Sequence, residues 1–283
     1  KKKRITLLKK YNNFNFAKVD ICDEKNLKKF ISRIKMINYF IHLAAQAGVI
    51  VLEKPPGVLV DRHPWYPDSP CLTEALQSQL DADKPELDRF ALKHVRPVYL
   101  LDPEVSGAVV YCGTADLSAK FRNDYGSNVC MLRFQFLARN VRPDTKPFTC
   151  ELPLAVHAKK NELLVSHRTG KQAKTCFRHL ESIGPYSCWE ALVPYYRLHQ
   201  VRCHAAECGL HIVGEDLYTQ EPLPYLSQFK RRYKGRSQER PLYPGIYLHL
   251  AEVQMPALGH PVEILPPQKL KVALERLSKM HAL

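Results

Sequence analysis

The stretch Val98–Cys112, V-Y-L-L-D-P-E-V-S-G-A-V-V-Y-C, constrains the fold more than any other part of this sequence. A short apolar run leads into an acid and a proline, and a β-branched run follows Ser106 and Gly107. This pattern predicts a turn at Asp102 directly before a buried strand over Val105–Tyr111. A carboxylate beside an apolar wall is costly unless it is paired or used chemically. Taken alone, the pattern is also typical of an Asp that caps a turn.

Three more blocks accompany this stretch. V-L-E-K-P-P-G-V-L-V precedes it at Val51–Val60, and R-L-H-Q-V-R-C-H and H-I-V-G-E-D-L-Y follow it at Arg197–His204 and His211–Tyr218. In chain order, the four blocks resemble K-P-x-G, H-R-L-D-x-x-T-S-G, G-R-T-H-Q-I-R-x-H and H-P-I-x-G-D-x-x-Y of the RluA family of RNA pseudouridine synthases. Tyr247–Pro266 resembles the closing strands of that family, so the resemblance covers about residues 50–270.

The resemblance implies an α+β pseudouridine synthase fold, with a mixed, largely antiparallel sheet and a central cleft. It also implies isomerisation of uridine to pseudouridine in structured RNA, such as rRNA or tRNA, with no cofactor and no metal. Asp102 would be the catalytic carboxylate, whether it attacks C1′ or takes the 2′ proton. Arg202 would be its ion-pair partner, because a planar guanidinium can orient a carboxylate and keep it ionised.

The substrate contacts implied by the resemblance come from several blocks. Lys54 could contact a phosphate, although a solvated lysine fits the same pattern. Phe134 would stack on the uracil, and Arg197 would face phosphate. The full set of implied substrate-binding residues is Lys54, Tyr99, Leu100, Phe134, Arg197, His199 and Gln200.

Three departures from the family motifs bear on activity. Tyr99-Leu100 stands where the family has His-Arg, and that Arg normally helps to displace the base. Val105 replaces a Thr and loses its hydroxyl. Phe134 stands where a Tyr usually stacks, so the stacking surface remains and the phenol is lost. These departures keep a second hypothesis open, in which the chain binds RNA through the same fold without catalysis.

Composition and charge set further bounds. The 283 residues are 45% hydrophobic, enough for a sizeable core, and no window approaches the ~18 continuous apolar residues that a membrane span needs. The nine cysteines have no disulfide-scaffold spacing, so we expect reduced thiols in the cytoplasm and a monomer. The net charge of +14 favours RNA as the partner. Residues 1–49 hold 12 Lys and Arg against 3 Asp and Glu, so most of this surplus is N-terminal.

Residues 1–49 differ from the rest of the chain, and we expect the catalytic domain to span residues 50–283. Residues 1–49 contain none of the 21 prolines and predict a strand, a helix and a second strand. This β-α-β unit resembles part of an NAD-dependent nucleotide-sugar epimerase, an extended short-chain dehydrogenase, with Asp20 near the adenine and His42–Gly48 along the cofactor. No Gly-rich phosphate loop or Tyr-x-x-x-Lys pair accompanies it, so we expect a fragment that binds no nucleotide cofactor. An epimerase function is the third hypothesis.

The remaining pattern completes the expected fold. Helices are predicted over residues 72–80, 114–123, 197–208 and 268–281, and strands over 131–140, 163–166, 173–180 and 187–193. Pro222–Pro244 interleaves cations with Phe229, Tyr233 and Tyr243, which is typical either of a nucleic-acid contact or of a solvated loop. The His and Cys residues near Arg202 fit no usual zinc spacing.

Overall fold

The structure, a computed structural model, describes residues 48–83, 85–88, 90–139, 145–230, 233, 235 and 238–281, with the backbone of strand Ile41–His42. These residues belong to one compact unit, Phe40–Leu283. The other segments expected within residues 1–49 lie outside the described residues. Strand β2 already begins at Val49, whose side chain is fully buried.

The described strands and helices follow one another along the chain in this order. They are β1 (Ile41–His42), β2 (Val49–Lys54), α3 (Leu72–Asp81), α4 (Pro85–Asp88), β3 (Arg96–Pro97), β4 (Ser106–Cys112), α5 (Ala115–Gly126), β5 (Met131–Arg139), β6 (Phe148–Cys150), β7 (Leu154–Val156), β8 (Leu163–Val165), β9 (Thr175–Ile183), β10 (Tyr186–Val193), α6 (Gln200–Glu207), β11 (His211–Ile212), the 3₁₀ turn η1 (Leu226–Gln228), β12 (Leu248–Gln254), the 3₁₀ turn η2 (Pro256–Leu258), β13 (Val262–Glu263) and α7 (Gln268–His281).

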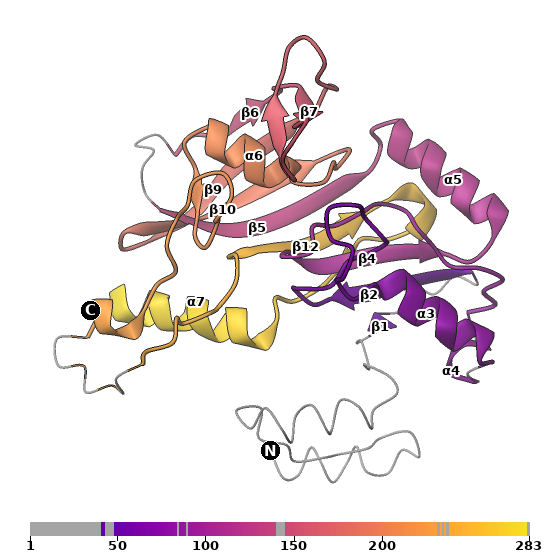
Figure 1. Ribbon diagram of the computed structural model, residues 1–283, viewed down its shortest axis with the longest axis horizontal. Helices are drawn as coiled ribbons and strands as arrows, with labels where there is room; N and C mark the ends of the chain where they lie inside the picture. Colours follow the sequence, from indigo (N-terminus) through magenta and orange to yellow (C-terminus); the bar gives the residue numbers. More distant parts are fainter. Residues whose placement is uncertain are drawn as a thin grey trace, which may run out of the picture. The chain divides into compact units, whose positions relative to one another are not determined.

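A large mixed sheet forms the middle of this unit (Figure 1). Its strands follow the order β1-β2-β4-β12-β5-β10-β9-β6, with β3, β11 and β13 paired at the side. All its pairs are antiparallel except β4 with β12, which run parallel. The expected mixed, largely antiparallel α+β fold is therefore confirmed.

The sequence patterns of strands β4 and β5 explain how each strand is buried. Every residue of β4 is buried, so its sequence is a continuous apolar run rather than an alternating one. In β5, by contrast, Leu132, Phe134 and Phe136 are buried at every second position and polar residues alternate with them. The period-2 pattern seen in residues 131–140 is thus the pattern of a half-covered strand.

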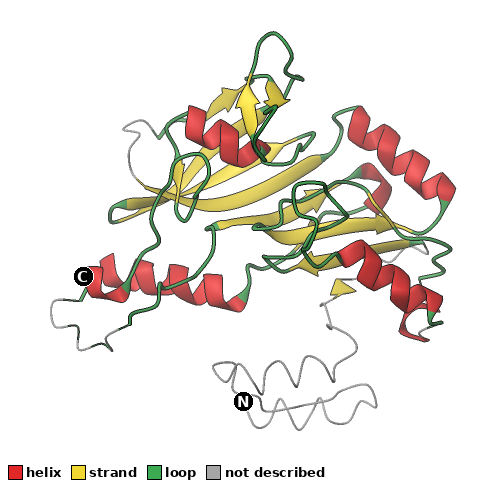
Figure 2. Cartoon of the chain, in the orientation of Figure 1, coloured by secondary structure: helices red, strands yellow, loops and turns green. Residues whose placement is uncertain are grey.

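The helices surround the sheet (Figure 2). Helix α5 begins after Thr114, whose side chain accepts the backbone N–H of Leu117 at 3.4 Å. Helix α7 buries Leu270, Ala273 and Leu277, at spacings of three and four residues, in a cluster with residues of β5 and of the β9–β10 hairpin. In Figure 1, α6 lies above strands β5, β9 and β10 and α7 lies below them.

The parallel contact between β4 and β12 depends on a glycine. Ser106 lies opposite His249, and Gly107 lies opposite Leu250. Gly107 has a φ of +148°, and a Cβ on it would lie 2.5 Å from the Cβ of Leu250. Any side chain here would push the two strands apart, which explains the S-G pair that follows the Asp102 turn.

The segment Pro222–Pro244 contributes two aromatic side chains to the protein interior. Tyr243 is buried and belongs to the cluster under α7, and Phe229 packs against the same cluster. Its ring also meets His281 edge-on, at 5.3 Å between centroids. Tyr243 is thus a core residue and Phe229 is partly buried against the core, whereas the sequence left a nucleic-acid contact and a solvated loop both open. Arg231, Arg232, Lys234 and Arg236 lie outside the described residues.

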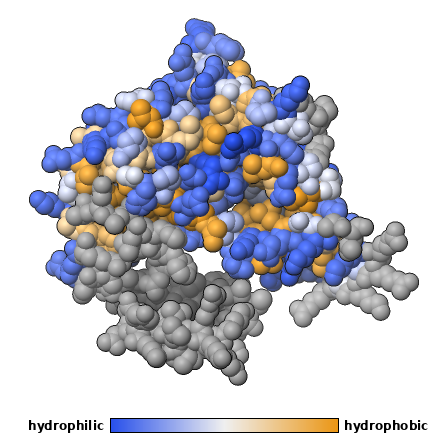
Figure 3. Space-filling model, turned by 180° about the vertical axis from the view of Figure 1, so that it is seen from behind, coloured by the Kyte–Doolittle hydropathy of each residue, from blue (hydrophilic) through white to orange (hydrophobic). Residues whose placement is uncertain are grey.

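The outer surface has no broad apolar face in the view from behind. Figure 3 shows hydrophobic patches interleaved with hydrophilic residues where the surface is not covered by grey atoms. Among the described residues, none of the helices combines the length and the apolar character of a membrane-crossing helix.

Candidate active site

Asp102 is fully buried at the turn that precedes β4. Its Oδ1 accepts two hydrogen bonds, from the hydroxyl of Tyr196 at 2.6 Å and from the backbone N–H of His199 at 2.8 Å. Its Oδ2 has no hydrogen-bond partner within the described part of the chain. One oxygen is therefore fixed by two donors while the other is left for a reacting atom, which is unusual for a buried carboxylate.

Arg202 lies on α6 and is 2% exposed. Its Nε and Nη2 donate to the two carboxylate oxygens of Glu215, at 2.6 and 2.9 Å. Its Nη1 donates to Glu104 at 3.1 Å and lies 3.9 Å from the Oδ2 of Asp102. The structure thus brings Arg202 to Asp102, as the motif implied, but the bidentate partner of the guanidinium is Glu215.

Glu215 was not singled out from the sequence, although it belongs to the G-E-D-L-Y block. It is buried, and it also accepts the backbone N–H groups of Leu217 and Tyr218 at 2.8 and 3.2 Å. Burial alone would raise the pKa of its carboxyl, but the contact with Arg202 outweighs burial and holds that pKa below its usual value. Burial likewise lowers the pKa of Arg202, and the pairing with Glu215 raises it further than burial lowers it. The pair is charged at neutral pH.

His199 positions the carboxylate through its backbone rather than through its ring. Its φ of +61° is left-handed, a conformation that non-glycine residues seldom adopt, and it directs the N–H at Asp102. The fully buried ring lies between the hydroxyls of Tyr66 and Tyr218, at 3.1 and 3.0 Å. Burial lowers the pKa of this imidazole, so the ring is neutral at pH 7. The ring therefore ties two loops together, and the expected contact of His199 with the substrate stays a prediction.

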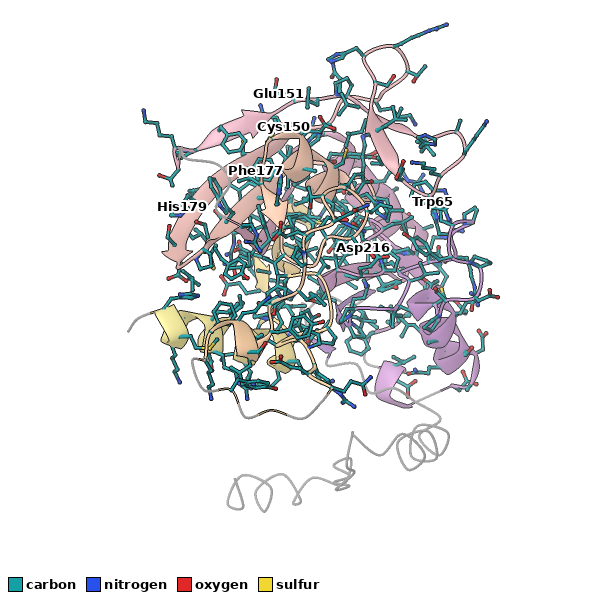
Figure 4. All side chains as sticks on the ribbon, turned by 60° about the vertical axis from the view of Figure 1, so that its left-hand side comes forward. Trp65, Cys150, Glu151, Phe177, His179 and Asp216 are labelled. Carbon is teal, nitrogen blue, oxygen red and sulfur yellow. The ribbon has the colours of Figure 1, made fainter. Side chains whose placement is uncertain are left out.

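Trp65, labelled in Figure 4, covers the same ring from the loop between β2 and α3. Its centroid lies 5.5 Å from that of His199. It also packs against the apolar cluster that includes Leu154 of β7 and Leu163 of β8. The loop of residues 61–70, for which no function was predicted, thus forms part of the wall around the site.

The side chains of Lys54 and Gln200 form hydrogen bonds within the protein. The buried ammonium of Lys54 donates to the carbonyls of Pro55, Val58 and Pro103, at 2.8 to 3.0 Å. Burial lowers the pKa of this lysine to about 7, against the opposing effect of Asp102 and Glu104. Its three donors join the entry turn to the turn after Asp102, so Lys54 is buried and not solvated, and its expected phosphate contact stays a prediction.

Gln200 is the first residue of α6 and is fully buried. Its side-chain oxygen accepts the N–H of Arg197 at 2.9 Å, and its amide donates to Lys174 and Thr175. It therefore fixes the start of α6, and the expected contact of Gln200 with the substrate stays a prediction. The helix begins at Gln200, so Arg197 lies in the preceding turn and not inside the helix.

A cleft of about 1200 Å³ lies beside the Asp102 turn. Tyr99, Leu100 and Arg197 line it, and their contact with a substrate stays a prediction. Leu100 is 36% exposed, whereas the hydroxyl of Tyr99 is buried and donates to Ala108 at 2.8 Å. The guanidinium of Arg197 lies 4.9 Å from the ring centre of Tyr195 and donates to the carbonyl of Gln172. Four cations line this cleft: Arg96, Arg122, Lys171 and Arg197.

Phe134 does not line the cleft. Its fully buried ring packs on the ring of Tyr196, with 5.0 Å between centroids and 34° between planes. Tyr196 does line the cleft. Burial, reinforced by Asp102, keeps the pKa of the Tyr196 phenol well above its ordinary value, so this hydroxyl is a donor to the carboxylate. Tyr196 is the second residue that the sequence reasoning missed.

No metal centre is formed by the described residues, since none of their His, Cys, Asp and Glu side chains gather in groups of three or more that could hold an ion. Figure 4 shows Cys150 and Phe177 on the strands at the other end of the sheet from Trp65.

Comparison with known proteins gives a consistent result. The model of the RNA pseudouridylate synthase family matches residues 48–207. Ribosomal large subunit pseudouridine synthase D of Haemophilus influenzae is 26% identical over 176 residues, which is 62% of this chain and 52% of that protein. An uncharacterised RNA pseudouridine synthase of Synechocystis sp. is 26% identical over 175 residues, 60% of this chain and 52% of that protein. The chain spans about half the length of these curated relatives.

Two solved human structures have a similar fold. RNA Pseudouridylate Synthase Domain Containing 4 superposes with a TM-score of 0.61 and 17% identity, covering 89% of this chain and 95% of that chain. For RNA Pseudouridylate Synthase Domain Containing 1 the TM-score is 0.53 at 18% identity, covering 82% and 84%. These comparisons do not bear out the epimerase resemblance of residues 1–49.

Proposed function

Because the chain belongs to the RNA pseudouridylate synthase family, we propose that it isomerises uridine to pseudouridine in structured RNA, such as rRNA or tRNA, with Asp102 as the catalytic carboxylate. The observation that carries this proposal is the state of Asp102. The carboxylate is buried, its Oδ1 is held by two donors, and its Oδ2 has no hydrogen bond among the described residues.

The reaction breaks the bond from ribose C1′ to uracil N1 and forms a bond from C1′ to C5. N1 gains a proton and C5 loses one, so the base is rearranged without oxidation or reduction. The free oxygen of Asp102 would act at the sugar, either as nucleophile at C1′ or as base for the 2′ proton. Arg202 places a positive charge 3.9 Å from this oxygen.

The cleft supplies features that suit an RNA strand. Arg96, Arg122 and Lys171 are exposed on its walls, and Arg197 lies over the ring of Tyr195. Cations attract the phosphate backbone, and an aromatic ring beside them offers a stacking surface for an unpaired base. We propose that the protein acts as a monomer in the cytoplasm, a compartment that suits the eight described cysteines, none of which forms a disulfide.

The deciding experiment measures tritium release from RNA that carries C5-labelled uridine. We expect the unchanged protein to release tritium and Asp102→Asn to reduce release at least 10³-fold, because Asn keeps the shape but cannot act as nucleophile or base. The melting temperature of Asp102→Asn should stay within a few degrees of that of the unchanged protein. Asp88→Asn, a matched change on the exposed end of α4, should release tritium like the unchanged protein. Turnover by Asp102→Asn at the unchanged rate would sink the proposal.

A second candidate function is RNA binding without catalysis. Two observations favour it: Asp102 is fully enclosed, and Leu100 stands where the family has an Arg. In that case the unchanged protein binds RNA with a strong salt dependence but releases no tritium at any protein concentration.

A further inference from the structure

Tyr196 stands between the cleft and the carboxylate. It lines the cleft, its side chain is 4% exposed, and its hydroxyl lies 2.6 Å from the Oδ1 of Asp102. Asp102 itself is fully buried and does not line the cleft. A molecule that reaches Asp102 from the cleft therefore meets the phenol ring first.

The same ring covers the surface on which a base would stack. Phe134 is fully buried, and the Tyr196 ring packs on it at 5.0 Å, with only 34° between the planes. The two aromatic rings are thus in contact in a tilted arrangement. A flat ring that packs on Phe134 and reaches Asp102 with a polar edge has the position and the chemistry of a flipped pyrimidine.

Sequence agrees with this substitution of a side chain for a base. In the motif G-R-T-H-Q-I-R-x-H, the residue before the first Arg is glycine, and in this chain that residue is Tyr196. A glycine would leave the volume beside Phe134 empty. We propose, on the basis of the function proposed above, that Tyr196 fills the binding place of the target base and must swing out before a uridine can reach Asp102.

The surroundings allow such a movement of the side chain without a movement of the backbone. Tyr125 uses its hydroxyl to accept the N–H of Tyr196 at 2.7 Å and to donate to its carbonyl at 3.0 Å. The backbone is thus held on both sides, and the displacement is a rotation of the side chain. The cleft of about 1200 Å³, which Tyr196 already borders, offers the space to receive the ring.

The test uses uridine 5′-monophosphate as a probe small enough to enter without RNA architecture. Isothermal titration compares the unchanged protein with Tyr196→Gly, Tyr196→Leu and Tyr196→Phe. We expect Tyr196→Gly to bind the nucleotide at least 10-fold more tightly than the unchanged protein. Tyr196→Leu, which retains apolar contact with Phe134 but is too short to reach Asp102, should gain less. Tyr196→Phe keeps the ring, so it should gain less than either.

Tyr225→Gly is the matched control, because Tyr225 lies at the start of η1 and is not among the described residues that line the cleft. It should not gain nucleotide affinity. If Tyr196→Gly and Tyr196→Leu fold and bind the nucleotide no better than the unchanged protein, the inference is wrong. If they gain affinity and no variant releases tritium, the base pocket stands and the proposed reaction fails. If Tyr196→Phe loses tritium release while every variant binds equally, Tyr196 positions Asp102 instead.

A measurement on the unsubstituted fold removes any dependence on variant stability. 3-Fluorotyrosine is placed at position 196, and its ¹⁹F resonance is recorded with and without saturating octauridylate. The displaced ring should gain a solvent isotope shift in D₂O that the free protein lacks. A resonance that stays buried while the oligonucleotide is bound would overturn the inference.

Discussion

At the scale of single residues, the site consists of partners that come from distant parts of the chain. Asp102 and Arg202 carry recognisable blocks, and the fold brings them within 3.9 Å although 100 positions separate them. Glu215 and Tyr196 could not be ranked from the sequence, because an acid or a tyrosine becomes a partner only through the fold. Likewise, nothing in the sequence indicates that the ammonium of Lys54, at the end of β2, donates to three carbonyl groups.

The bidentate pair on α6 gives a prediction about stability. Arg202→Met should destabilise the protein by about 3–5 kcal/mol, because it leaves the buried Glu215 without its cation. Adding Glu215→Gln should restore part of that loss, since a neutral amide avoids the uncompensated charge. Urea denaturation of the two single variants and the double variant measures the coupling. A double variant no more stable than Arg202→Met would show that Glu215 is not the main partner.

At the scale of elements, the sequence predicted which segments become strands and helices, and it could not predict which strands become neighbours. The expected helices at 72–80 and 268–281 are α3 and α7, and the expected strand at 131–140 is β5. These assignments rest on local periodicity, which is a property of the segment itself. The parallel contact of β4 with β12 joins positions 143 apart, and no local pattern encodes it.

That contact includes a buried histidine and gives a prediction about pH. His249 donates to the carbonyl of Ile264 and accepts from the hydroxyl of Ser106, both at 2.9 Å. Burial lowers its pKa to about 4, below the ~6.5 of an unfolded chain. Between these two values only the unfolded chain takes up the proton, so stability is present above pH 6.5 and falls as pH decreases towards 4.

The loss attributable to His249 should be about 3 kcal/mol over that range. Urea denaturation measures the free energy of unfolding at pH 7 and pH 4. The difference in this free energy between the unchanged protein and His249→Gln should be smaller at pH 4 than at pH 7 by this amount. His260→Gln, at an exposed position, is the matched control. Equal pH dependence in both histidine variants and the unchanged protein would contradict the assignment.

At the scale of the whole molecule, the charge is distributed unevenly along the chain. Residues 1–39 hold 12 Lys and Arg against 3 Asp and Glu, whereas the family match starts at residue 48 and β2 at Val49. Composition predicts a domain boundary near residue 50, and that boundary stays a prediction. It also predicted a basic protein without indicating that exposed cations line the cleft itself.

Removing residues 1–39 should separate electrostatic from structural effects. We expect a protein that begins at Phe40 to melt within a few degrees of the full chain, because it retains the second compact unit. Its affinity for RNA should fall and should depend less steeply on salt, since fewer cations displace counterions from phosphate. Binding titrations at 50 and 200 mM salt measure the slope. A melting temperature lower by ten degrees or more would show that these residues stabilise the fold.

The place of β12 in the sheet has a consequence for how the protein is made. Strand β12, at Leu248–Gln254, pairs with β4 on one side and with β5 on the other. A ribosome that adds about 5–20 residues per second delivers β12 on the order of ten seconds after β4 and β5. During that interval both neighbours have an open edge, which is the kind of surface that other chains can extend. The nascent protein is thus most in need of a chaperone before its last long strand has emerged.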